Sequence, residues 1–165
     1  MTFRITVIGS SGKISQEVSA LAEEVGQAIA RQGAILITGG KDGVMEAVSR
    51  GAKKAGGTTV GILPEHSDTG VNPYVDIPLS TGINFARNYI NVVTADAIVS
   101  IAGAGGTLSE IGYAIALKKR TILLNGTGGV TEMIINNITL FSDAEIHVAN
   151  TSEEAVRLAI GLDSS

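Results

Sequence analysis

The sequence predicts an α/β fold, a single domain over residues 1–165 in which an open parallel sheet lies between two layers of helices. Short apolar runs alternate with helical segments from one end of the chain to the other. The runs are continuous stretches of Val, Ile and Leu, which are typical of strands buried on both faces. A chain of 165 residues suits one domain with a sizeable core, and it contains no linker and no long repeat. Alternating strands and helices of this kind predict a parallel sheet between layers of helices.

The first half of the chain contains four expected strands and two clear helices. An apolar run at 3–8 predicts the first strand, and a helix at 15–32 ends at Gly33. The second strand is expected at 34–38, and a helix follows Gly43 and closes at Gly56-Gly57. The third strand is expected at 58–63 and a short one at 75–79, with the polar loop 64–73 between them as the longest irregular stretch.

The second half repeats the same alternation. A helix is expected at 84–95, a strand at 97–101, and a helix at 108–118 whose end carries basic residues that offset the helix dipole. The remaining strands are expected at 121–124 and 146–148, and the remaining helices at 129–137 and 152–160. The last helix starts with a capping box, Thr151-Ser-Glu-Glu154.

Composition excludes several classes of function. The chain has no cysteine, which excludes disulfides and thiol chemistry, and its two histidines lie far apart, so no metal site is expected. The net charge is −4, and there is no block of Lys or Arg, which argues against a nucleic acid partner or an anionic membrane surface. No apolar run is long enough for a membrane span, and a strand rather than a signal peptide begins the chain, so a cytoplasmic protein is expected.

The segment 98–110 carries the clearest sign of chemistry. An apolar run ends at Gly103-Ala104-Gly105-Gly106, and Thr107 and Glu110 follow with the spacing of a helix start. A strand, a glycine-rich bend and a helix N-terminus in this order form an anion site, because the first amides of the helix have no internal acceptor. The twenty-one glycines of the chain, about twice the usual share of about 7%, are clustered in turns of this kind.

Two further glycine-rich loops are expected beside this one. In open parallel sheets, ligands bind outside the carboxyl ends of the strands, where the strand order reverses. In a Rossmann-like order, the strands at 3–8 and 97–101 are neighbours there, so the loop Gly9-Ser10-Ser11-Gly12 faces the segment at 103–107. The loop after the second strand, with Gly39, Gly40 and Gly43, forms a third wall. None of the loops has the dinucleotide fingerprint or the P-loop pattern, which argues against hydride transfer and ATP hydrolysis.

Taken together, these motifs resemble the LOG family of phosphoribohydrolases, often mislabelled lysine decarboxylases, and even more its shorter relatives that include the molybdenum cofactor carrier protein. The family pattern P-G-G-x-G-T-x-x-E corresponds to residues 102–110, and G-G-x-x-G-[LV]-M corresponds to Gly39 through Met45. The N-terminal G-S-S is Gly9-Ser10-Ser11, and a family arginine ahead of Ala-Asp-Ala falls on Arg87. The match covers about residues 5–124.

The resemblance implies a nucleotide site and assigns roles to its residues. In the phosphoribohydrolases the arginine and the final glutamate form the catalytic pair, which here are Arg87 and Glu110. They would cleave the bond between a base and ribose 5′-phosphate without any cofactor. The residues that the resemblance and the loops assign to the ligand or its phosphate are Gly9, Ser10, Ser11, Gly39, Gly40, Gly43, Gly103, Gly105, Gly106 and Thr107. The resemblance also implies a homodimer or higher homo-oligomer, with the helix at 84–95 in the interface.

Several alternatives stay open at this point. Ala102 and Ala104 replace the proline and second glycine of the family pattern, which favours a binding or carrier protein for a molybdopterin-type cofactor or a signalling nucleotide over an enzyme. Glu110 has a structural alternative as the glutamate of a capping box that starts at Thr107. The glycines after the second strand are also suitable as plain turn residues, and Ser10 and Ser11 as local caps. Nothing resembles a pyridoxal phosphate site, so lysine decarboxylation is rejected.

Overall fold

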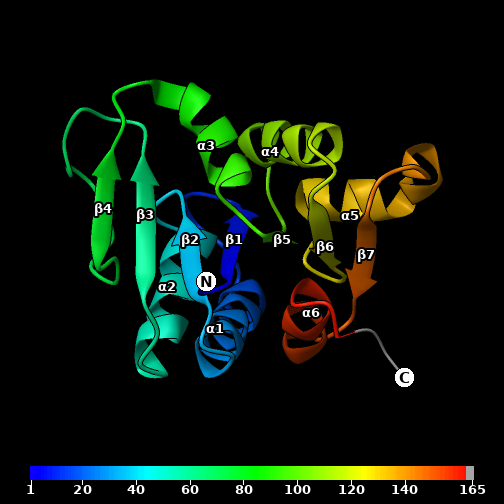
Figure 1. Ribbon diagram of the computed structural model, residues 1–165, viewed down its shortest axis with the longest axis horizontal. Coiled ribbons are helices and arrows are strands. Elements are labelled where there is room, and N and C mark those ends of the chain that lie inside the picture. Colours follow the sequence, from blue (N-terminus) through cyan, green and yellow to red (C-terminus); the bar gives the residue numbers. More distant parts are fainter. Residues whose placement is uncertain (163–165) are drawn as a thin grey trace.

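The computed structural model describes residues 1–162 and has the expected three layers (Figure 1). All seven strands are parallel and follow the order β4-β3-β2-β1-β5-β6-β7. The strands are β1 (Arg4–Gly9), β2 (Ile35–Thr38), β3 (Thr59–Leu63), β4 (Ile77–Ser80), β5 (Ala97–Ile101), β6 (Arg120–Leu124) and β7 (Ile146–Ala149). The helices are α1 (Gln16–Arg31), α2 (Val44–Lys54), α3 (Arg87–Val93), α4 (Gly105–Ala116), α5 (Gly129–Asn136) and α6 (Ser152–Ala159). The predicted fold class, a Rossmann-like α/β sheet, is therefore confirmed.

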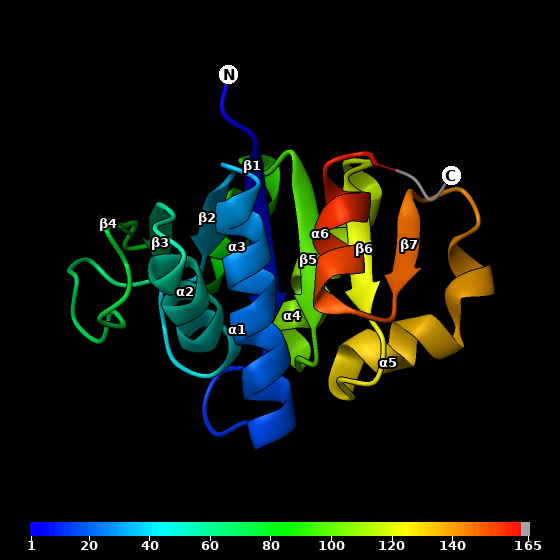
Figure 2. The same cartoon turned by 90° about the horizontal axis from the view of Figure 1, so that it is seen from below.

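The two faces of the sheet carry separate cores. Helices α1, α2 and α6 cover one face, and α3, α4 and α5 cover the other, as both views of the ribbon show (Figures 1 and 2). Successive residues of a strand point to opposite faces, so Val7 of β1 belongs to the first core and Ile8 to the second. Burial on both faces explains why the strands appear in the sequence as continuous apolar runs.

Three differences from the predicted elements go beyond a shift of one or two residues at an end. Helix α4 begins at Gly105, three residues before the expected start at 108. The helix expected over 84–95 is a short 3₁₀ turn (Asn84–Ala86) followed by α3, and a further 3₁₀ turn (Ile138–Phe141) follows α5. The cap of α6 is confirmed, because the amide of Glu154 donates to the Thr151 hydroxyl at 3.1 Å.

Strand pairing brings the predicted loops to one edge. Strand β1 pairs with β5 in parallel, with Gly9 beside Ile101, so the loops after these strands are neighbours. Strand β2 lies on the other side of β1, so the loop after β2 lies at the same edge.

Among residues 1–162, no helix is long and apolar enough to cross a membrane. No group of three or more side chains in the same range has the composition of a metal site.

Candidate functional site

A cavity of about 360 Å³ opens at the carboxyl edge of the sheet, where the strand order reverses at β1. It lies between the loops that follow β1 and β2, the start of α3 and the first turns of α4. The lining residues are Val7, Ile8, Gly9, Ser10, Ser11, Gly39, Lys41, Met45, Phe85, Arg87, Asn88, Ala104, Gly106, Thr107 and Glu110. This is the position in which open parallel sheets bind their ligands.

The N-terminus of α4 forms one wall of the cavity and carries no side-chain cap. The residue before the helix is Ala104, whose side chain cannot accept a hydrogen bond, and residues 104–106 are exposed. The first amides of the helix are thus available to an anion in the cavity. Because the helix starts at Gly105, Thr107 lies inside its first turn, and the capping-box interpretation of Thr107 and Glu110 is wrong.

The turn before α4 is held from both sides. The amide of Gly103 donates to the Ser10 hydroxyl at 2.8 Å, across 93 positions of the sequence, so Ser10 joins the two facing loops and is not a local cap. Behind the turn, the Ala102 amide donates to Thr127 at 2.9 Å, and the Thr131 hydroxyl donates to the Ala102 carbonyl at 2.7 Å. These contacts fix a strained backbone, since Ala102 has a φ of 54°.

Arg87 crosses the cavity from the start of α3. Its Nη1 donates to the carbonyl of Ile62 at 2.7 Å, and it passes over Gly39, where a Cβ atom would overlap the guanidinium. Gly39 thus leaves the space that the Arg87 guanidinium occupies, and a side chain at this position would displace it. The Nε atom of Arg87 is buried and has no hydrogen-bond partner among residues 1–162, so the contact with Ile62 leaves the guanidinium incompletely satisfied.

Glu110 lies in the cavity wall on the second turn of α4 and is only 7% exposed. Its Oε1 accepts a hydrogen bond from Asn91 Nδ2 at 2.8 Å. Burial raises the pKa of the Glu110 carboxyl to about 7, against the opposing effects of the Asn91 hydrogen bond and the Arg87 charge. Among residues 1–162, no ion pair within 4.0 Å joins Arg87 to Glu110, so the two groups face the cavity separately.

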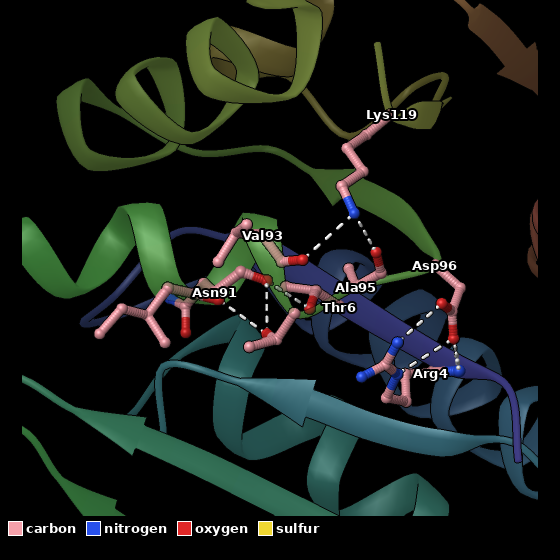
Figure 3. Close-up of polar contacts among 9 residues, drawn as sticks. Arg4, Thr6, Asn91, Val93, Ala95, Asp96 and Lys119 are labelled. Carbon is pink, nitrogen blue, oxygen red and sulfur yellow. Dashed lines mark hydrogen bonds and ion pairs between the residues drawn. The ribbon is translucent and has the colours of Figure 1, made fainter. Parts of the chain in front are cut away.

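The backbone that carries Asn91 is anchored to the sheet (Figure 3). The Thr6 hydroxyl of β1 donates to the Asn91 carbonyl at 2.7 Å. After α3 ends, Lys119 donates to the Val93 and Ala95 carbonyls at 3.2 and 2.6 Å. The C-terminal end of α3 is thereby fixed, and with it the amide that contacts Glu110.

Eight of the twelve residues expected at the site line the cavity: Gly9, Ser10, Ser11, Gly39, Arg87, Gly106, Thr107 and Glu110. Gly40, Gly43, Gly103 and Gly105 are not part of the lining. Gly40 and Gly43 have positive φ angles and serve as turn residues, and Gly103 packs against Thr107 behind the turn.

Sequence reasoning missed the side chains that have no motif. Lys41 lies inside the glycine motif and lines the cavity, yet only its flanking glycines were expected there. Asn88 donates to the Ser109 hydroxyl at 2.9 Å and lines the wall between α3 and α4. Phe85 stands at the rim, 80% exposed. The only signal for Asn88 was its position directly after Arg87, and Phe85 had none.

Known proteins resemble this chain over nearly its whole length. The model of the SLOG cluster4 family matches residues 2–156. An uncharacterized protein from Archaeoglobus fulgidus is 39% identical over 157 residues, which cover 95% of this chain and 94% of that protein. The molybdenum cofactor binding protein from Rippkaea orientalis is 36% identical with a TM-score of 0.87, covering 96% of this chain and 95% of that one. The molybdenum cofactor carrier protein from Chlamydomonas reinhardtii is 34% identical with a TM-score of 0.87, covering 98% of both chains.

Proposed function

The chain belongs to the SLOG cluster4 family, and from this premise we propose that it is a carrier that binds a molybdopterin-type cofactor in the cavity and releases it unchanged. The observation that carries the proposal is the pairing, in one cavity, of the uncapped N-terminus of α4 with the incompletely satisfied guanidinium of Arg87. The names of two relatives, a molybdenum cofactor binding protein and a molybdenum cofactor carrier protein, support this choice of ligand.

The lining residues suit the parts of such a ligand. A molybdopterin carries a phosphate, and the α4 amides with the hydroxyls of Ser10 and Ser11 would donate to it. Its fused rings are planar, and the exposed ring of Phe85 at the rim provides a stacking surface. Its ring N–H groups need acceptors, and the Glu110 carboxyl supplies a free oxygen besides the one bound to Asn91.

The test is retention of the cofactor by the purified protein. Molybdenum cofactor released from a molybdoenzyme is mixed with the chain and passed over a gel-filtration column. Pterin is then measured by fluorescence after oxidation, and molybdenum by mass spectrometry. We expect both to elute with the protein, and retention to fall about tenfold or more in Arg87→Met, which loses a charged hydrogen-bond donor.

The matched control is Arg31→Met. It removes the same charge, but Arg31 lies on α1, on the opposite face of the sheet. It should retain the cofactor like the original chain. Elution of the protein without pterin, or equal retention by Arg87→Met, would contradict the proposal.

A second candidate is hydrolysis of a nucleoside 5′-monophosphate to a free base and ribose 5-phosphate. The observation that favours it is the Glu110 carboxyl, which faces the cavity with a pKa of about 7 and is therefore able to give or take a proton at neutral pH. Incubation with AMP, followed by chromatography for adenine, tests it. Adenine release that disappears in Glu110→Gln would support the enzyme, and absence of adenine would leave the carrier as the function.

We also propose that the chain forms a homo-oligomer through α3 and α4. Five large apolar side chains on α3, on α4 or directly after α4 are exposed: Tyr89, Val93, Leu108, Tyr113 and Leu117. Tyr89 of α3 and Tyr113 of α4 meet edge to face with their ring centroids 5.3 Å apart. This contact joins the exposed apolar side chains of the two helices into one patch. Light scattering is expected to give at least twice the mass of one chain, and Tyr113→Glu is expected to give monomers. A monomeric original chain would contradict this proposal.

A further inference from the structure

Both basic side chains in the cavity lining of residues 1–162, Lys41 and Arg87, lie near one carboxylate that is not itself part of the lining. This is Glu65, in the loop after β3. Its Oε1 pairs with Lys41 Nζ at 2.7 Å. The hydrogen bond from Lys41 is the main cause that lowers the pKa of Glu65, and the charge of Arg87 contributes to the same shift. Glu65 therefore faces both positive charges that a ligand phosphate would meet.

The second carboxylate oxygen of Glu65 shows that this arrangement is not fully satisfied. Its Oε2 is buried and has no hydrogen-bond partner among the described residues. A buried carboxylate oxygen without a donor lowers the stability of the protein. If the ion pair with Lys41 had only a structural role, this unsatisfied oxygen would have no explanation. Movement of Lys41 to a ligand phosphate would let Glu65 turn toward water at small cost, since its side chain is 40% exposed.

Anchoring of the loop does not explain the pair, because other bonds hold this loop. The Asn72 amide donates to the Gly40 carbonyl at 2.9 Å, and Asn72 Nδ2 donates to the Lys41 carbonyl at 2.8 Å. The Glu65 backbone carbonyl accepts from Gly82 at 2.8 Å. These contacts use backbone groups and Asn72, so they remain when the Glu65 side chain is changed.

We propose that Glu65 is an internal counter-anion that competes with the phosphate of the ligand for Lys41, and so weakens binding and speeds release. The inference rests on the proposed function, because it requires that the cavity binds a phosphorylated ligand. A carrier must give up its ligand, and a carboxylate already paired with the lysine of the site lowers the free energy gained when the phosphate arrives.

The experiment compares Glu65→Gln with the original chain in calorimetric titrations with inorganic pyrophosphate and with AMP. Gln keeps the shape and removes the charge. We expect about tenfold tighter binding at low salt, the size of one partly buried charge interaction. The gain should shrink at high salt, where the charges are screened. Glu65→Ala, which also removes the charge, is expected to show the same gain.

Two controls separate this role from a general effect of charge. Asp68→Asn removes a negative charge from the same loop, where Asp68 accepts from Ser80 and is not paired with Lys41, and should leave the affinity unchanged. In a Lys41→Met background, Glu65→Gln should give a clearly smaller gain, because only the charge of Arg87 then remains near Glu65. The role of Glu65 would be overturned, with the proposed function left standing, if Glu65→Gln bound with the affinity of the original chain or if Asp68→Asn gained as much affinity as Glu65→Gln. Absence of binding by every variant, together with no cofactor retention, would instead overturn the proposed function and this inference with it.

Discussion

Replacement of Glu110 by Gln should change how the stability of the protein depends on pH. Gln has the shape of the carboxyl and can still accept the hydrogen bond from Asn91, but it cannot ionise. In the folded chain, burial raises the pKa of Glu110 from 4.5 to about 7. The folded state therefore keeps a proton that the unfolded state releases between these two values, so the free energy of unfolding falls as pH rises through this window.

The size of the effect follows from the two pKa values. A change from 4.5 to about 7 corresponds to about 3 kcal/mol, at about 1.4 kcal/mol per pH unit. Below about pH 4.5 the original chain and Glu110→Gln should differ little in this respect, since the carboxyl is protonated in both states. Above about pH 7 the variant should be more stable by up to about 3 kcal/mol, a figure that already includes the attraction of Glu110 to Arg87.

The assay is urea unfolding of both chains at several pH values between 5 and 8, with helix content followed by circular dichroism. Glu17→Gln is the matched control, because Glu17 is exposed in the first turn of α1. The difference between Glu110→Gln and the original chain should grow with pH up to about 7 and then level off, while the control shows no such trend. A difference that stays constant from pH 5 to 8 would refute the assignment of a raised pKa to Glu110.

Three further predictions concern the backbone around the cavity. Gly39→Ala should displace Arg87 and weaken pyrophosphate binding about tenfold in calorimetry, whereas Gly112→Ala, where a Cβ atom meets nothing within 4 Å, should leave it unchanged. Thr127→Val leaves the Ala102 amide and the carbonyl at the end of β6 without their partner, and should lower the free energy of unfolding in urea by about 2–3 kcal/mol; a loss below about 0.5 kcal/mol would contradict this. Ala102→Pro should cost at least about 3 kcal/mol in thermal unfolding, because proline cannot adopt a φ of 54° and lacks the amide, while Ala102→Gly should change stability by less than about 1 kcal/mol.

The sequence alone predicted which loops meet, although it did not give all the side chains between them. Gly9 and Ser10 were expected opposite the segment at 103–107, and the pairing of β1 with β5 confirms this neighbourhood. The prediction worked because parallel strands all end at one edge, so loops far apart in the sequence are brought together by the order of the strands. No such rule predicts that Lys41 lies close to Glu65, because their distance depends on how the irregular loop after β3 folds across the carboxyl edge of the sheet.

The start of α4 shows the limit of local reasoning. The spacing of Thr107 and Glu110 is equally compatible with a capping box and with a functional carboxyl, since both alternatives use the same residue types. The structure distinguishes them in two ways: α4 begins at Gly105, before Thr107, and its packing against α3 places Asn91 against Glu110 and buries the carboxyl in the cavity wall.

The resemblance to a family supplied the expectation that Arg87 and Glu110 belong to the site. The sequence by itself determined the fold class, the order of strands and helices along the chain, and the three glycine-rich loops. These follow from local patterns, namely the apolar runs, the glycines and the motif spacing, which the chain carries in any conformation. The tertiary structure decided where α4 starts, how Gly39 makes room for Arg87, and which charge faces which. The physical reason is that pKa values, ion pairs and close approaches depend on distances between segments remote in sequence, and folding alone sets those distances.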